Sequence, residues 1–207
     1  MIKRSEYLRA RQQAAEMIRE AGIQMTDAEA AGIDIVDFGL GQLAVEGVQV
    51  FTMFATGRIS AKVLVMFPHQ TEPEHWHPPV GDDPGKEETI RVISGTLNFY
   101  TPGKDTLKQG WVPAGKKACY TCRHEIVMKP CDQLTLVPGT KHWFQAPAGG
   151  AVFYSFSTCV RDGLDQFSDP AVVRQTKIID DVEAEDYSAR FCRSAGNKAD
   201  APDTGES

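Results

Sequence analysis

Four side chains have the types and spacing that could hold a metal ion. His75 and His77 lie two positions apart in "EPEHWHPP", and side chains at such positions of a strand share one face. Glu88 follows after a loop, and His142 comes just after the Pro138-Gly139 turn. Imidazole and carboxylate donors suit open sites for Mn²⁺, Fe²⁺, Co²⁺ or Zn²⁺. We predict that these four residues form one metal site; the alternative places the first two histidines in a surface loop.

The way in which Glu88 reaches the histidines depends on strand pairing. A Pro-Pro pair and "GDDPG" form a connecting loop, and the next strand opens at Glu88 with Ile90 and Val92 on the same face. If the strands before and after this loop pair as a hairpin, the carboxylate lies across from both imidazoles. We therefore expect a hairpin at this place.

Two lysines could serve a reaction beside these ligands. Lys62 lies in the apolar run "SAKVLVMF", where a lysine is seldom buried without a partner. One interpretation places its ammonium group in the mouth of a barrel, where it could stabilise an oxyanion or move a proton. The alternative is a lysine that extends its charge into water. Lys86 is expected at the same mouth, with an exposed loop position as the alternative.

Composition and charge exclude several classes of protein. The chain has 207 residues, of which 42% are hydrophobic and 24% charged, as in ordinary globular proteins. A net charge of −6 argues against a nucleic-acid or anionic membrane partner, which would need a basic patch. The charged N-terminal segment lacks the apolar region of a signal peptide, and no apolar run approaches the ~20 residues of a membrane helix. We expect a cytoplasmic protein.

The five cysteines are an odd number without a secretory signal, so we expect no disulfide framework. Cys119 and Cys122 form a Cys-x-x-Cys, but the segment lacks a second such pair. In an alternating strand, residues three apart would also point to opposite faces. We favour reduced, partly buried thiols over a structural zinc site.

The hydrophobic pattern changes its period near residue 48. Residues 3–21 show an apolar stripe at helical spacing that ends at Gly22, which predicts an N-terminal helix. From Val48 onward, short β-branched or aromatic runs alternate with Gly and Pro, as in sandwiches and barrels. We predict one domain over residues 1–180 with a core at about 48–160. Residues 181–207 are expected to form a short helix and a polar, disordered tail.

The candidate ligands resemble the first signature motif of the cupin superfamily, which reads His-x-His, a spacer, Glu, six residues and Gly; here the motif ends at Gly95. The spacer is longer than in common cupins, and "PGTKH" matches the second motif loosely. A closer resemblance, over roughly residues 1–180, is to the D-lyxose isomerase family of cupins, in which the long spacer is usual. It rests on four segments: "DFGLG", "EHWHPPVGDDPGKEETIRVISG", "LVPGTKHWFQA" and the "FS…DP…VR" run of residues 167–174.

This resemblance implies a mainly β fold, the jelly-roll-like barrel (double-stranded β-helix) of the cupins, with an N-terminal α-helix. It implies a homodimeric, Mn²⁺-dependent isomerase that interconverts D-lyxose and D-xylulose, and often D-mannose and D-fructose. The metal ligands of the family fall on the four residues named above, its active-site lysine on Lys62 and its N-terminal aspartate on Asp37. We expect Asp37 and Lys86 to contact the sugar, with capping of a turn as the alternative for Asp37.

Isomerising an aldose moves a proton between C2 and C1 through a cis-enediol, so a base must lift this proton and return it. We expect Lys62 to act on the sugar oxygens and Asp165, in "RDGLDQFSD", to be the base, with Asp162 as second choice. Both aspartates could instead lie in a solvated turn beside Gly163, which occupies one position where relatives are expected to have a glutamate.

Two other functions fit the same four ligands. A cupin dioxygenase would use Fe²⁺ and O₂, and a sugar-binding or regulatory cupin would catalyse nothing. The polar residues expected near the ligands favour a polyol substrate over an apolar or thiol substrate. A lysine inside the barrel favours catalysis over binding alone.

Overall fold

Strands dominate the computed structural model, which describes residues 1–158 and 160–181. The helices are α1 (Arg4–Glu20) and α2 (Asp27–Ala31), with 3₁₀ turns at Lys117–Cys119 and Asp162–Leu164. The strands are β1 (Ile2–Lys3), β2 (Asp34–Val36), β3 (Val48–Ala55), β4 (Ile59–Met66), β5 (Thr71–Trp76), β6 (Glu88–Gly95), β7 (Leu97–Thr101), β8 (His124–Met128), β9 (Gln133–Leu136), β10 (His142–Gln145), β11 (Ala151–Thr158), β12 (Gln166–Phe167) and β13 (Ile178–Ile179).

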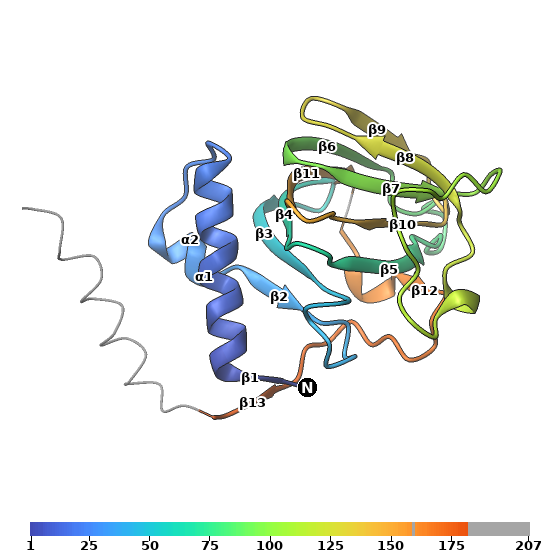
Figure 1. The fold of residues 1–207 in the computed structure, drawn as a ribbon. Coiled ribbons are helices and arrows are strands. Elements are labelled where there is room, and N and C mark those ends of the chain that lie inside the picture. The colour runs from blue at the N-terminus through green and yellow to red at the C-terminus, as the bar shows by residue number, and fades with distance from the viewer. Residues whose placement is uncertain (159, 182–207) are drawn as a thin grey trace, which may run out of the picture.

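Two antiparallel sheets enclose the core. One sheet has five strands in the order β12-β5-β10-β7-β8, and the other has six in the order β2-β3-β4-β11-β6-β9. β1 pairs with β13 in a separate parallel pair beside the foot of α1 (Figure 1). Apolar side chains from both sheets meet between them, among them Leu64, Ile90, Phe99 and Phe144. Each such fully buried side chain stabilises the fold by about 1.5–3 kcal/mol.

β6 has one face buried in the barrel interior and one face partly exposed. Glu88, Ile90 and Val92 are buried, while Thr89 and Arg91 between them are partly exposed. This alternation confirms the shared face predicted for the first three residues and turns Glu88 toward the interior. The barrel wall therefore supplies an acidic group at its inner surface.

α1 covers the outer face of the six-stranded sheet, on the side of β3 and β4 (Figure 1). Its buried residues Ala14, Ala15 and Ile18 pack with Val63 and Val65 of β4, and the predicted helix at residues 3–21 is confirmed to within a residue at each end. The helix α2 was not predicted. Its signal was present, because Thr26 and Glu29 form a capping box.

The predicted hairpin between the strands of His77 and Glu88 is wrong. β5 pairs with β10 and β12, whereas β6 pairs with β11 and β9, so the two strands belong to different sheets. The long loop between them crosses from one sheet to the other, because a connection of this length does not impose hairpin pairing. Glu88 therefore approaches the histidines across the barrel interior.

β5 contains a bulge at Pro73-Glu74. His75 pairs with His142 and Glu72 pairs with Phe144, so three steps along β5 correspond to two along β10. Proline cannot donate to the ladder, and it is tolerated at bulges for this reason. The extra residue places Glu72 and His75 on the same, inner face of the strand.

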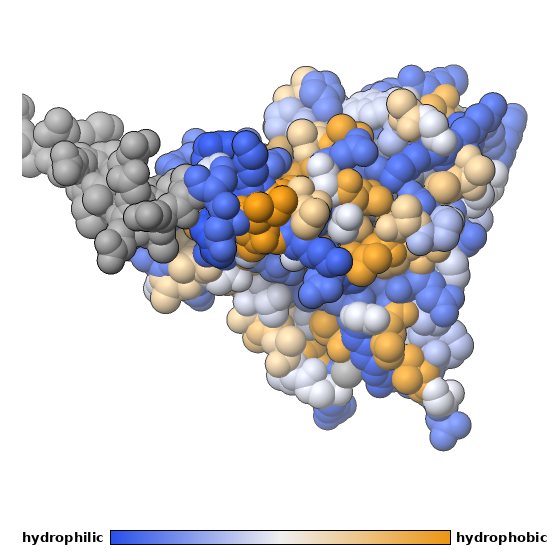
Figure 2. Space-filling view, turned by 90° about the horizontal axis from the view of Figure 1, so that it is seen from below, coloured by the Kyte–Doolittle hydropathy of each residue, from blue (hydrophilic) through white to orange (hydrophobic). Residues whose placement is uncertain are grey.

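The ends and surface of the chain add little to the site. The short helix predicted after residue 181 lies outside the described residues, and the domain boundaries stay a prediction. Within residues 1–158 and 160–181, no helix is both long and apolar enough to cross a membrane. Seen from below, the surface shows hydrophobic residues in small groups among hydrophilic ones (Figure 2).

Candidate metal centre and active site

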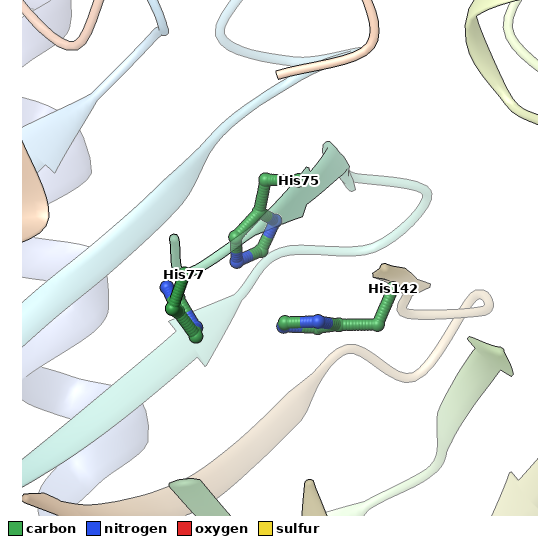
Figure 3. Close-up of side chains that lie close together, drawn as sticks. All are labelled: His75, His77 and His142. Carbon is green, nitrogen blue, oxygen red and sulfur yellow. The ribbon is translucent and has the colours of Figure 1, made fainter. Parts of the chain in front are cut away.

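Three imidazoles converge where β5 ends and β10 begins. The nearest ring nitrogens of His75, His77 and His142 all lie within 4.8 Å of one another, and all three residues are buried. Figure 3 shows the rings turned toward a common space, two from the β5 segment and one from β10. The pairing of His75 with His142 across the two strands brings them together although the sequence separates them widely.

Backbone carbonyl groups fix two of these rings. The Nδ1 atom of His75 lies 2.8 Å from the Pro73 carbonyl oxygen, and that of His142 lies 2.9 Å from the Thr140 carbonyl oxygen. A carbonyl oxygen only accepts, so each Nδ1 carries the proton and each Nε2 presents a lone pair. Nε2 of His142 is buried without a hydrogen-bond partner among the described residues. Burial lowers the pKa of His75 well below its ordinary value and that of His142 to about 4, so both rings are neutral.

The third ring is held by a carboxylate. His77 Nδ1 lies 2.7 Å from Asp165 Oδ1, and its Nε2 lies 3.1 Å from Glu88 Oε2. Burial lowers the pKa of His77, but the hydrogen bonds to Asp165 and Glu88 outweigh it and raise the pKa. A carboxylate on the distal nitrogen is the usual support of a metal-binding histidine. Asp165, predicted as the base, thus has one oxygen committed to His77.

Glu88 adds an oxygen donor to the three nitrogens. Its Oε2 also lies 3.9 Å from His142 Nε2, while Oε1 accepts hydrogen bonds from Ser155 and from Lys86, the latter at 3.3 Å. Burial raises the pKa of Glu88, but the Lys86 ammonium and neighbouring histidines outweigh it and hold the pKa well below its usual range. Two neutral imidazoles, a third imidazole that a metal ion would hold in its neutral form, and one ionised carboxylate fit a borderline first-row metal ion.

A small, partly open cavity lies beside these ligands. Its apolar wall includes Val50, Leu64, Phe144 and Phe167. Besides Glu88, the charged lining comprises Lys62, Glu72, Lys86, Asp162, Asp165 and Arg174. A space of mixed lining suits a small polyhydroxylated ligand.

Lys62 lies inside this cavity rather than in water. It is 7% exposed, and its ammonium nitrogen lies 2.5 Å from Asp162 Oδ2. Arg174 approaches the same carboxylate oxygen at 3.7 Å. Burial raises the pKa of Asp162, but the charge of Lys62 outweighs it and lowers the pKa. This location corresponds to the first interpretation of Lys62, a cation facing the ligand space.

Asp37 lies elsewhere. Its carboxylate accepts hydrogen bonds from the amides of Gly39 and Gly41, both at 3.0 Å, and lies 3.8 Å from the N-terminal ammonium group. Phe38 and both glycines have positive φ, so this carboxylate stabilises a turn of unfavourable backbone conformation. Asp37 is not among the residues that line the cavity, and its hydrogen bonds match the alternative role of a cap, while the expected sugar contact stays a prediction.

The two cysteines of the Cys-x-x-Cys motif are free. Cys119 ends a 3₁₀ turn, and Cys122 is buried with its thiol 3.4 Å from the Lys141 carbonyl oxygen. Burial raises the pKa of both thiols, that of Cys122 to about 12. Within the part of the chain that the structure describes, the three histidines form the one cluster with metal-ligand spacing. The burial of both residues matches the expected partly buried thiols, and their reduced state stays a prediction.

Two cavity residues were not predicted from the sequence. Arg174 was quoted in a motif but received no role, and Glu72 received none either; strict alternation along the strand would turn Glu72 away from His75. The proline inside the β5 run is the signal that could have indicated a bulge. Burial raises the pKa of Glu72 to about 8.

Comparison with known proteins identifies the family of the chain. The family model described as D-lyxose isomerase matches residues 4–189, which is most of the chain. The chain belongs to the D-lyxose isomerase family. The family resemblance expected from "EHWHPPVGDDPGKEETIRVISG" and the other segments is thereby confirmed.

Individual members of the D-lyxose isomerase family align over nearly their whole length. The D-lyxose ketol-isomerase of Cohnella laeviribosi is 48% identical over 178 residues, which cover 86% of this chain and 98% of that protein. The D-lyxose/D-mannose isomerase of Thermosediminibacter oceani is 40% identical over 181 residues, which cover 87% and 100%. A ligand-free L-ribose isomerase structure from Cellulomonas parahominis covers 86% of this chain and 98% of its own, with a TM-score of 0.70 at 17% identity. The last comparison confirms the cupin-type fold.

Proposed function

We propose that this member of the D-lyxose isomerase family is a metal-dependent aldose–ketose isomerase that interconverts D-lyxose and D-xylulose, and also D-mannose and D-fructose. The observation that carries the proposal is the convergence of three histidine rings and one carboxylate beside a cavity lined by buried charged groups. The names of the two relatives, D-lyxose ketol-isomerase and D-lyxose/D-mannose isomerase at 48% and 40% identity, suggest the substrates.

His75, His77, Glu88 and His142 would hold the metal ion, for which we propose Mn²⁺. When bound, the ion acts as a Lewis acid that polarises carbonyl and hydroxyl oxygens of the sugar. Oxygen and neutral nitrogen donors without thiolate suit Mn²⁺. The role of Asp165 is to hold the His77 ring in the orientation that directs Nε2 inward.

Two lysines act on the sugar in this proposal. In the cis-enediol mechanism O1 gains negative character as the C2 proton leaves, and a buried ammonium group beside it stabilises that charge. Lys62 fits this task because Asp162 fixes its ammonium group in the cavity. Lys86, held 3.3 Å from Glu88, lines the same space and is positioned to donate to a sugar hydroxyl.

The expected result of a direct assay is ketose formation that depends on metal. Protein stripped with EDTA should be inactive, and Mn²⁺ should restore conversion of D-lyxose to D-xylulose and of D-mannose to D-fructose, measured by chromatography. D-ribose serves as a third aldose. Absence of ketose from all three sugars would contradict the proposal. Oxygen uptake by the Fe²⁺-loaded protein would indicate a dioxygenase, and sugar-induced thermal stabilisation without turnover would indicate a binding protein.

We further propose a homodimer, located in the cytoplasm. Beyond the area that α1 covers, the outer face of the six-stranded sheet presents Phe54 and Phe156, which are 47% and 42% exposed and flank Ala61 in register. Exposed apolar groups that continue a covered face are typical of an interface. The free thiols of the described cysteines agree with a reducing compartment.

The dimer has its own test. Phe156→Glu should shift the sedimentation coefficient from that of a dimer to that of a monomer, because a charge replaces an apolar contact. Val137→Glu is a matched control, since Val137 is 64% exposed and directly follows β9, the strand at the far edge of that sheet. A wild-type protein that sediments as a monomer, or a dimer that survives Phe156→Glu, would contradict this interface.

A further inference from the structure

Four carboxyl groups line the cavity, and three of them are bound by partners. Glu88 is bound to His77 and Lys86, Asp162 to Lys62, and Asp165 to His77. A base that takes a proton from carbon needs an accessible lone pair within reach of that carbon. The three bound groups already have other tasks, as a metal ligand, a counter-ion and a support of a ligand.

Glu72 is the fourth carboxyl group, and it is different. Its Oε2 atom is buried without a hydrogen-bond partner among the described residues, and its Oε1 atom lies 3.9 Å from His75 Nε2, beyond hydrogen-bond distance. Burying a polar group without a partner destabilises a fold, so such a group is expected where it serves a ligand. Glu72 is one of the residues that line the cavity that would receive the sugar.

The β5 bulge explains why this carboxyl group is at the reactive end of the cavity. The extra residue at Pro73-Glu74 turns Glu72 to the inner face together with His75. Glu74 occupies the position that strict alternation would give to Glu72, and it binds Thr121 and Ser168 instead. The carbons that react must lie beside the proposed ligands, and Glu72 is next to one of them.

We propose that Glu72 is the general base that carries the proton between C2 and C1 of the open-chain sugar, an inference that rests on the isomerase function proposed above. Glu72 takes the proton from C2, and the C–H electron pair forms the C1=C2 double bond while the carbonyl electrons move to O1, which gains a proton. Glu72 then returns its proton to C1 as O2 loses a proton and C2 becomes the carbonyl carbon. The proton gained by O1 and the proton lost by O2 are exchanged through Lys62, so the sugar is isomerised without a net change in protons.

The test separates this role from metal binding. Glu72→Gln keeps the shape of the side chain and removes its ability to take a proton. With Mn²⁺ and D-lyxose in deuterated water, the variant should retain wild-type metal content while isomerisation falls by about 10²–10⁴-fold, the usual contribution of a general base. Uptake of solvent deuterium at C1 of the ketose should fall in parallel. Glu87→Gln, a matched control at an exposed neighbour of Glu88, should stay within about twofold of wild type.

Several outcomes would overturn the assignment. Glu72→Gln with near-wild-type turnover would remove Glu72 from the reaction, and loss of metal from this variant would make it a fifth ligand. Loss of deuterium uptake in Asp162→Asn or Asp165→Asn, with full metal content and with Glu72→Gln still active, would move the role to an aspartate. Failure of the wild-type protein to form any ketose in the same assay would instead contradict the isomerase function itself.

A second variant covers the case in which glutamine disturbs folding. Glu72→Ala leaves room for a small carboxylic acid at the vacated position. Added formate should raise the turnover of the folded, metal-loaded variant by at least about tenfold over its turnover without formate. Absence of rescue in that protein would count against a proton-transferring carboxylate at this position.

Discussion

His142→Ala is expected to abolish metal binding and, with it, isomerisation. Its Nε2 atom is buried, carries a lone pair fixed by the Thr140 carbonyl group, and has no hydrogen-bond partner among the described residues. The other two members of the cluster, His75 and His77, are proposed ligands themselves, so neither can replace His142. Loss of a supporting residue alone usually weakens metal affinity by 10–100-fold, so loss of a direct ligand should weaken it by more than about 100-fold.

Metal content and thermal stability, measured on the same protein, test this prediction. Mass spectrometry of the metal should show less than a tenth of the wild-type Mn²⁺ after dialysis, and added Mn²⁺ should no longer raise the melting temperature. His69→Asn is the control, because His69 is exposed, lies outside the cluster and has a positive φ that asparagine tolerates. A fully loaded His142→Ala protein would show that the metal, if any, binds elsewhere.

Lys62→Ala is expected to keep the metal and lose turnover. Lys62 makes no contact with the four proposed ligands, and Asp162 retains Arg174 at 3.7 Å after the lysine is removed. Removal of one donor to a developing oxyanion commonly lowers kcat by about 10²–10³-fold. We therefore expect a fall of that size in kcat with unchanged metal stoichiometry.

The comparison of kcat with KM identifies the role of this lysine. If Lys62 stabilises the transition state, kcat and kcat/KM should fall together, whereas a binding role would raise KM with little change in kcat. Lys104→Ala, the same substitution in an exposed loop, should leave both constants unchanged. An unchanged kcat in Lys62→Ala would show that the ion pair with Asp162 serves the fold.

Much of the barrel could be predicted from local pattern. The alternation in β6 placed Glu88, Ile90 and Val92 on one face, and the structure confirms this because burial follows the strand period. The spacing of His75 and His77 and the Pro-Gly turn before His142 indicated residues that the structure brings together. These predictions depend on properties of a few neighbouring residues, which a sequence displays directly.

Features that depend on pairing between distant strands could not be predicted in this way. The inward position of Glu72 is set by its register with Phe144, and the support of His77 by Asp165 joins residues 88 positions apart. The partner strands of β6 were also wrong, because a long loop leaves the choice of sheet open. Such features follow from the global arrangement of strands.

The bulge in β5 makes the contacts of this strand sensitive to the number of its residues. Deletion of Glu74 would remove the extra residue, so that two steps along β5 would match two along β10 and Glu72 would remain on the inner face with His75. The amides of Thr121 and Cys122, each 2.6 Å from Glu74, would lose their acceptor at the same time. Natural variation among relatives should therefore include substitutions in this segment far more readily than insertions or deletions.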